Sequence, residues 1–212
     1  TLAYLAEERA LIANRSSLVD HRSSLIVVMS TSPHSSNVQV AVRIRPLSTR
    51  EQMAGALECV QLLADQQQVA AGADRSWTFD ACLGSESRQE EVFALAQPLL
   101  ESFLAGYNAT ILAYGQTGSG KTFTMGTGLD DLGEECVGLL PRAIRFIFSR
   151  LAEEQGGVEA VLCSYLEIYN EELHDLLNAQ TTRLTIREGG QGQIWVAGLT
   201  EEAVETYSQV MK

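Results

Sequence analysis

The sequence predicts an α/β fold in which helices flank a central, mostly parallel sheet. Short apolar runs alternate with segments of helical periodicity along most of the 212 residues, and this alternation is typical of layered α/β domains. A glycine-rich loop stands between one such run and a helical segment, which is a second feature of these folds. The chain is long enough to enclose one hydrophobic core.

Composition and charge narrow the range of functions. Hydrophobic residues make up 45% and charged residues 20% of the chain, which is ordinary for a globular domain. No apolar run reaches the length of a membrane span or of a signal-peptide core, so we expect no membrane contact and a cytosolic or nuclear protein. A net charge of −12, from 15 basic and 27 acidic residues, argues against nucleic-acid binding, which needs a basic surface.

Residues 1–36 are expected to form a poorly ordered N-terminal extension. The first methionine is Met29, and the polar run STSPHSSN follows it. The composition before Met29 has no counterpart downstream. Met29 is therefore a candidate for the natural first residue, and residues 1–28 are candidates for upstream sequence carried over from gene prediction or from a splice variant. The predicted domain covers residues 37–212.

Upstream of the glycine-rich loop, alternating or continuously apolar runs predict strands. These strands are expected over Val38–Ile44, 57–63, 67–71, 76–80 and Thr110–Tyr114, the last of them buried. Ser87–Ala105 repeats apolar residues on one helical face, so it is predicted to be a helix. Gly106 ends that helix, as a C-terminal glycine commonly does.

Downstream of the loop, the spacing predicts helices over Pro141–Leu151, Glu171–Leu177 and Glu201–Met211. Thr200 is the expected N-cap of the last helix. A long strand is expected over Val158–Tyr169. Two short apolar runs, 184–186 and 194–196, flank the turn REGGQGQ and predict a hairpin.

The loop Gly115–Thr122, GQTGSGKT, fits the pattern G-x-x-x-x-G-K-[ST] between a strand and a helix. Its glycines allow a tight turn that brings backbone N–H groups against phosphate oxygens. Lys121 places a compact charge on the β and γ phosphates, the Thr122 hydroxyl ligates Mg²⁺, and the following helix adds its dipole. We therefore predict a nucleoside triphosphate site, and a P-loop NTPase fold, from Gly115, Gln116, Thr117, Gly118, Ser119, Gly120, Lys121 and Thr122.

From residue 37 to residue 212 the sequence resembles the motor domain of kinesins. The resemblance rests on separated blocks in the order of that family: VAVRIRPL, QEEVF, GYNATILAYGQTGSGKTFTMG, GLLPRAIRFIF and SYLEIYNEELHDLL. The acidic insert LDDLGEECVG is similar to that of kinesin-4-type motors. The resemblance implies that this chain is the N-terminal half of a kinesin motor domain, and therefore an incomplete P-loop NTPase fold with ATP and Mg²⁺ as cofactors.

The resemblance also implies an adenine site between the R-x-R-P turn and the residue that follows the phosphate loop. In this sequence the corresponding residues are Arg43, Arg45, Pro46 and Phe123. An aromatic face can stack on a base, and arginine can stack on it or reach the phosphates. The residues alone favour a core phenylalanine and two solvated strand-edge charges, and only the resemblance favours the adenine site. Other polar residues of the family blocks are expected to be structural: Asp80, Glu167, Tyr169 and Asn170.

Contact with microtubules is expected to be weak in this half. The resemblance implies that the 183–196 hairpin faces tubulin, and Arg183 and Arg187 are its basic candidates. A solvated hairpin with two ordinary charges is the alternative. The resemblance places the main track-binding loops and the neck linker downstream, and a downstream coiled coil would make the whole protein dimeric.

Kinesins need two switch motifs for hydrolysis. The first, N-x-x-S-S-R-S-H, does not occur in the sequence, and the pattern of the second, D-x-x-G, occurs only at residues 130–133 in the acidic insert, ahead of where the resemblance places that switch. No catalytic residue is therefore assigned, and this chain alone is expected to be inactive. The resemblance implies that strands of the missing half lie between strands of this half. Without them, open strand edges and apolar faces make the chain aggregation-prone.

The first functional hypothesis is the ATP-binding part of a microtubule motor of the cytoplasm and cytoskeleton, whose parent protein hydrolyses ATP to drive movement along microtubules. The second is a truncated, non-catalytic product that binds nucleotide or a partner subunit. A third is an unrelated P-loop enzyme such as a nucleotide kinase.

Overall fold

The computed structural model describes residues 23–30, 38–63, 67–72, 75–126, 133–153, 161–181, 183–190 and 192–211, and for residues 23–30 the backbone alone. The chain divides into two compact units, Thr1–Ala143 and Ile144–Lys212. Each unit is described by itself. No helix among the described residues has the length and apolar character that crossing a membrane requires.

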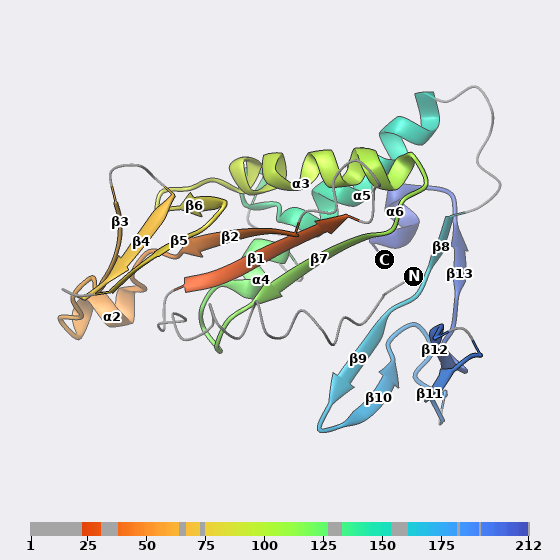
Figure 1. The fold of residues 1–212 in the computed structure, drawn as a ribbon. Helices are drawn as coiled ribbons and strands as arrows, with labels where there is room; N and C mark the ends of the chain where they lie inside the picture. Colours follow the sequence, from red (N-terminus) through yellow and green to blue (C-terminus); the bar gives the residue numbers. More distant parts are fainter. Residues whose placement is uncertain are drawn as a thin grey trace. The chain divides into compact units, whose positions relative to one another are not determined.

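A sheet of four described strands forms the centre of the first unit, in the order β6-β2-β1-β7 (Figure 1). Its strands are β1 (Ser23–Ser30), β2 (Val38–Ile44), β6 (Ala81–Leu83) and β7 (Ala109–Tyr114). β2 and β6 run parallel, and β1 runs antiparallel to both β2 and β7. β2, β6 and β7 therefore point the same way, and the predicted α/β fold with a mostly parallel sheet is confirmed.

Strand β1 departs from the prediction of a poorly ordered segment over residues 1–36. Ser23–Ser30 lies between β2 and β7, with Val27 opposite Val40 on one side and opposite Leu112 on the other. Its sequence, SSLIVVMS, holds a continuous apolar run with β-branched residues, which suits a strand that is paired on both edges. The other residues of 1–36 lie outside the described residues.

Helix α3 (Gln89–Leu104) packs on the sheet, where it contacts β1 and β7. Its buried Val92, Ala96 and Leu99 form one core cluster with Ala41 of β2. The predicted helix over Ser87–Ala105 is thus confirmed, because apolar residues at helical spacing make one continuous buried face.

Gly106 ends α3 as predicted. Its φ of 95° is left-handed, and its N–H donates to the Phe103 carbonyl at 3.0 Å while the Tyr107 N–H donates to the Ser102 carbonyl at 3.1 Å. These two bonds form a Schellman motif, which satisfies carbonyls that the last helical turn leaves free.

The opposite face of β2 packs on a small antiparallel sheet of β3 (Val60–Leu62), β4 (Gln68–Ala71) and β5 (Arg75–Thr78). The core cluster on this face contains Val40, Val42, Ile44, Val60, Val69 and Phe79. The strands predicted over 57–63, 67–71 and 76–80 are confirmed in shorter form. Asp80 accepts the Val40 N–H at 2.7 Å, which agrees with its predicted structural role.

A short helix that the prediction omits, α2 (Thr49–Met53), follows Pro46. Ser48 and Glu51 form a capping box around its first turn. The spacing S-x-x-E was the sequence signal for this helix.

β7 is less buried than predicted. Leu112 is 40% and Tyr114 42% exposed, whereas Ala109 and Ile111 pack against the α3 cluster. Side chains alternate across a strand, so one face of β7 is covered and the other is open among the described residues.

Helix α5 (Leu139–Glu153) confirms the helix predicted over Pro141–Leu151. A 3₁₀ turn, η1 (Glu134–Cys136), precedes it.

The second unit contains three antiparallel strand pairs among its described residues. The pairs are β8 (Val161–Cys163) with β13 (Glu202–Val204), β9 (Leu166–Tyr169) with β10 (Glu172–Asp175), and β11 (Thr185–Glu188) with β12 (Ile194–Ala197). The predicted hairpin at β11–β12 is confirmed. The predicted long strand over Val158–Tyr169 is interrupted between β8 and β9, and residues 158–160 lie outside the described residues.

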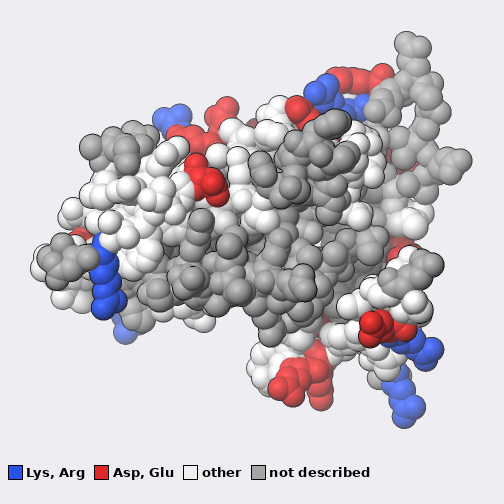
Figure 2. Space-filling view, viewed as in Figure 1, with Lys and Arg blue, Asp and Glu red and all other residues white. Residues whose placement is uncertain are grey.

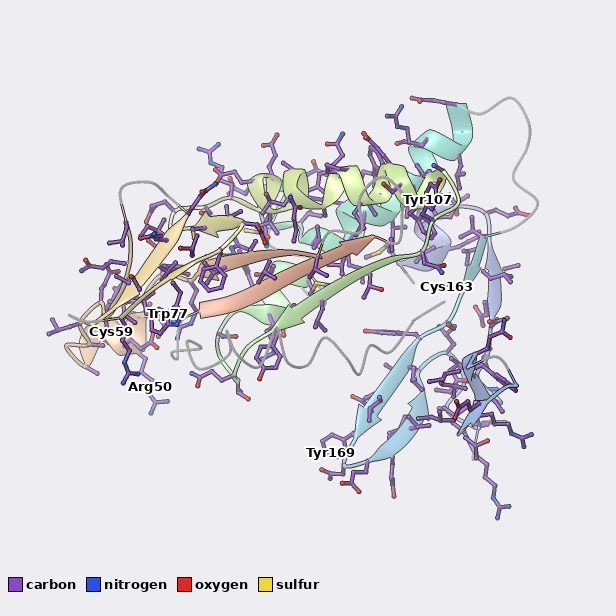
Figure 3. All side chains as sticks on the ribbon, in the orientation of Figure 1. Arg50, Cys59, Trp77, Tyr107, Cys163 and Tyr169 are labelled. Carbon is purple, nitrogen blue, oxygen red and sulfur yellow. The ribbon has the colours of Figure 1, made fainter. Side chains whose placement is uncertain are left out.

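The predicted helix over Glu171–Leu177 is wrong, because β10 forms there. Asn170 and Glu171 have φ values of 48° and 68°, and such a pair reverses the chain into a tight hairpin. Cross-strand pairing with β9 then overrides the helical spacing of the apolar residues. Tyr169 stands at the turn end of β9 (Figure 3).

The predicted helix over Glu201–Met211 is also wrong for its first half. β13 takes Glu202–Val204 by pairing with β8, and only α6 (Tyr207–Val210) is helical, with Thr206 as its N-cap in place of Thr200. The Thr200 N–H instead donates to the carboxylate of Asp175 at 2.9 Å.

Candidate functional site

The glycine-rich loop connects β7 to the short helix α4 (Lys121–Met125). Gly118 and Gly120 have φ values of 83° and 99°, a left-handed conformation that residues with a Cβ rarely adopt. Gly120 is the N-cap of α4 and Gly126, with φ 82°, is its C-cap. Because α4 is little more than one turn, its dipole is small, and the loop N–H groups are the main donors for an anion.

Lys121 folds over the loop that precedes it. Its Nζ donates to the carbonyl oxygens of Gly115 at 2.6 Å and of Gln116 at 2.7 Å. A charged phosphate oxygen is a stronger acceptor for an ammonium group than a neutral carbonyl is. The position of this cation therefore suits an anionic ligand held by the loop.

Ser119 gives an independent sign of a polar ligand. Its side chain is 1% exposed, and its Oγ has no hydrogen-bond partner among the described residues. Buried hydroxyls normally have a partner in the protein or in a ligand. The orphaned hydroxyl lies in the centre of the predicted phosphate loop, so the residues present fit a triphosphate.

Thr122 is exposed, and its hydroxyl is the predicted ligand of Mg²⁺. In the described part of the chain, no group of His, Cys, Asp or Glu side chains is placed to hold a metal ion. A magnesium ion here would therefore depend on Thr122 and on oxygens of the nucleotide itself, as is usual for this small, hydrated cation.

A pocket lies beside the loop and brings both halves of the predicted site together. It is lined by Arg43, Ile44, Arg45, Pro46, Ser85, Ser87, Ser119, Gly120, Phe123 and Thr124. All four predicted adenine contacts are among these residues. The other predicted residues belong to the loop outside the pocket lining: Gly115, Gln116, Thr117, Gly118, Lys121 and Thr122.

Phe123 is not a core residue, although the residues alone favoured that interpretation. Its side chain is 39% exposed, and the Arg43 guanidinium lies 5.2 Å from the centroid of its ring. This distance is within the range of a cation–π contact. The ring therefore has one face toward a cation and remains accessible in the pocket.

Arg43 is buried rather than solvated, with 7% of its surface exposed. Its Nη1 donates to Gln89 Oε1 at 2.9 Å and to Thr124 Oγ1 at 3.0 Å, and its Nη2 donates to the Ser87 carbonyl at 3.1 Å. Desolvation lowers the pKa of Arg43, and the nearby charge of Glu91 partly opposes this. The guanidinium is thus hydrogen-bonded to three groups of the protein and braces the pocket wall, while its contact with adenine stays a prediction.

Arg45 joins α2 to the phosphate loop. It forms a two-pronged pair with Glu51, at 2.7 Å from Nη1 and 2.6 Å from Nη2, and its Nε donates to the Gly118 carbonyl at 2.6 Å. The hydrogen bond that Arg45 donates to Glu51 raises the pKa of Arg45, and the same contact holds the pKa of Glu51 well below its usual range. Arg45 is thus a positioning residue for the loop.

Gln89 is the main residue of the site that the sequence did not single out. It is 1% exposed at the start of α3, accepts from Arg43, and donates from Nε2 to the Phe123 carbonyl at 2.6 Å. The only signal was a polar residue at the third position of the predicted helix Ser87–Ala105, within the block QEEVF. Its role depends on the placement of three separate segments, which a linear pattern does not contain.

Arg183 and Arg187 lie in the second unit and are both exposed. Arg187 is on β11 opposite Trp195 of β12. Figure 2 shows basic side chains near this hairpin with acidic ones beside them. The positive charge offered there is small, and a contact of this hairpin with tubulin stays a prediction.

Comparison with known proteins identifies the family. The model of the kinesin motor domain matches residues 43–212. The human kinesin-like protein KIF27 is 44% identical over 178 residues, which cover 82% of this chain and 13% of that protein. The human chromosome-associated kinesin KIF4A is 41% identical over 172 residues, which cover 79% of this chain and 14% of that protein.

The fold comparison agrees. A solved structure of a fast kinesin superposes with a TM-score of 0.73 at 33% identity, covering 81% of this chain and 49% of the solved chain. The chain thus spans about half of that motor and a small part of the curated relatives. The kinesin-4 likeness stays a prediction, while the alternative of an unrelated nucleotide kinase is contradicted by the family match. The chain belongs to the kinesin motor domain family.

Proposed function

We propose that this chain is the ATP-binding part of a microtubule motor, and that the whole protein hydrolyses ATP to move along microtubules of the cytoskeleton. The observation that carries the proposal is the loop Gly115–Thr122, where the Lys121 ammonium and the buried Ser119 hydroxyl lie beside the Phe123 pocket. Membership of the kinesin family supports it.

Different residues of the site would bind different parts of the nucleotide. Lys121 and the loop N–H groups would hold the β and γ phosphates, and Phe123 would hold the adenine. Thr122 would hold Mg²⁺, which neutralises phosphate charge when it is bound. Arg43 and Arg45 would keep the pocket wall and the loop in place through the contacts described above.

Replacement of Lys121 tests this site. Lys121→Ala removes the charge that reaches the Gly115 and Gln116 carbonyls of the loop, so binding of Mg·ATP to the full chain should weaken at least about a hundredfold, the cost of a lost charged contact. Isothermal titration calorimetry measures it. Lys212→Ala, which removes the same charge elsewhere, should keep the affinity. Equal binding by Lys121→Ala would contradict the proposal.

Turnover separates the motor hypothesis from that of a non-catalytic product. N-x-x-S-S-R-S-H does not occur in the sequence, and D-x-x-G occurs only at residues 130–133, ahead of the position of the second switch in kinesins. Positioning of the attacking water is the step that these switches serve in kinesins. We expect no microtubule-stimulated phosphate release from the 212-residue chain and measurable release from the whole motor domain. Release from the short chain would show that this half contains catalytic residues that we have not assigned.

Arg183 and Arg187 are proposed as a weak contact with the acidic microtubule surface. Charge reversal of both, Arg183→Glu with Arg187→Glu, should lower co-sedimentation of the whole motor with microtubules a few-fold at low salt, and the difference should shrink as salt rises. Reversal of Arg75, an exposed arginine of β5 in the first unit, serves as the control. An unchanged affinity at low salt would indicate a solvated hairpin.

A further inference from the structure

Strand β1 connects the two strands that lead into the candidate site. β2 carries Arg43 and runs on to Arg45 and Pro46, whereas β7 runs directly into the phosphate loop at Gly115. In the strand order β6-β2-β1-β7, β2 and β7 do not pair with each other. Among the described strands, β2 and β7 are therefore connected through β1 (Ser23–Ser30), which pairs with both.

The register places this connection beside the site. Leu25 lies opposite Val42 on the β2 side and opposite Tyr114 on the β7 side. Ser24 lies opposite Arg43. Neighbouring strands are about 4.8 Å apart, so β1 holds the ends of β2 and β7 roughly 10 Å from each other. That spacing sets the distance between the pocket wall and the phosphate loop.

β1 lies outside the part of the chain that matches the family, which begins at residue 43. It runs antiparallel between strands that point the same way, yet α3 packs on it as well as on β7. If β1 left the sheet, facing rows of N–H and C=O groups on β2 and β7 would lose their partners. The sheet pairing of both walls of the site thus depends on this one segment.

We propose that Ser23–Ser30 is a bridging strand that sets the spacing between the Arg43 wall and the phosphate loop, and that its release from the sheet weakens nucleotide binding. The second half of this inference rests on the proposed ATP site. The first half, the position of the strand, does not, so the two are tested separately.

Amide hydrogen exchange of the full chain tests the position of the strand. Val27→Pro removes an N–H at a residue that is paired on both sides, and proline is not tolerated in a central strand. Exchange over Val38–Ile44 and Ala109–Tyr114 should accelerate at least about tenfold. Ser35→Pro adds the same residue outside β1 and should leave exchange there unchanged. Equal exchange in the two variants would overturn the proposal.

Cysteine crosslinking gives a second measurement that does not require the proline variant to fold. Val27→Cys with Leu112→Cys creates a directly opposed pair. Val28→Cys with Leu112→Cys shifts the pair by one residue, so that the two positions are no longer directly opposed. Oxidation and peptide mapping should yield the 27–112 disulfide in clear excess. Equal yields, or an excess of the 28–112 disulfide, would overturn the strand position.

Nucleotide titration tests the role. Mg·ATP affinity should fall at least about tenfold in Val27→Pro, a cost of about 1.4 kcal/mol, and should be kept in Ser35→Pro and in the 27–112 disulfide. If Val27→Pro binds as the unchanged chain does, the bridging role is overturned. If the unchanged chain binds no nucleotide while its exchange and crosslinks are as expected, the proposed ATP site fails but the strand position is supported.

Discussion

The guanidinium of Arg43 joins three separate segments of the first unit. It leaves β2, reaches Gln89 and the Ser87 carbonyl at the start of α3, and reaches Thr124 of α4. A buried cation is tolerated only when its donors are satisfied, and these three acceptors together with the Phe123 ring supply that. A lysine would keep the charge but lose the planar fork that serves several acceptors at once.

Asp175 has the corresponding role in the second unit. Its side chain is 5% exposed and accepts the N–H groups of Leu177 at 3.0 Å, Asn178 at 3.1 Å and Thr200 at 2.9 Å. The hydrogen bonds from Thr200, and then those from the two other backbone groups, lower its pKa against an opposing effect of burial. The lowered pKa favours the ionised form of Asp175, and this carboxylate links β10 to Thr200, which precedes β13.

We expect Asp175→Asn to destabilise the chain at pH 7, because an amide donates where an acceptor is needed. The folded pKa is below the unfolded value of about 3.9, so the contribution of the carboxylate is fully present above pH ~4 and is lost as pH falls through the folded pKa. Denaturant unfolding at pH 7, 5 and 3 measures the difference from the unchanged chain. A difference that does not shrink at pH 3 would contradict the charge-based account.

Two glycines hold the elements around the phosphate loop together. Gly126 ends α4, and Gly138 immediately precedes α5. A Cβ built on either residue would overlap backbone atoms of the other. The end of α4 and the start of α5 are therefore in direct backbone contact, a distance that only glycine allows.

Gly138→Ala should force these backbones apart and destabilise the first unit by about 1–3 kcal/mol, the range for overpacked sites. Because α4 begins with Lys121, Mg·ATP affinity should fall as well. Denaturant unfolding and titration calorimetry measure the two effects. Gly190→Ala, where the added carbon meets no atom within 4 Å, should change stability by less than about 0.5 kcal/mol. Equal effects of the two substitutions would argue against the contact.

Elements with one strong periodic signal were predictable, and those defined by distant partners were not. α3 and β2 follow from their apolar spacing, and the phosphate loop from its glycines and Lys121. β10 carries a helical pattern, but the hairpin turn at Asn170 and pairing with β9 decide its form. β1 was missed because a short apolar run does not show which edges it will pair with, and Gln89 because its partners come from other segments.

The molecule as a whole leaves large apolar side chains in the open. In the second unit these include Leu162, Ile168, Tyr169, Ile186 and Trp195, with exposed fractions between 48% and 64%. The chain covers 49% of the solved kinesin that it matches. Exposed apolar side chains of this size favour association with other apolar surfaces.

We therefore expect the isolated 212-residue chain to bind a hydrophobic dye strongly and to associate at micromolar concentration. Ile168→Ser with Ile186→Ser should lower dye binding, because both side chains are 63% exposed and their loss removes apolar surface without opening a cavity. Fluorescence titration and light scattering report the two quantities. A cooperative thermal transition with low dye binding in the unchanged chain would refute the expectation.

The contact between Gly126 and Gly138 also bears on how this part of the sequence can change over time. Both ends of the segment between them are pinned at one point, so its length has little influence on the elements outside it. Doubling such a segment costs only about 0.6 kcal/mol in loop-closure entropy. Insertions and deletions should therefore accumulate between the two glycines while the phosphate loop keeps its shape, and a peptide tag inserted there should be tolerated.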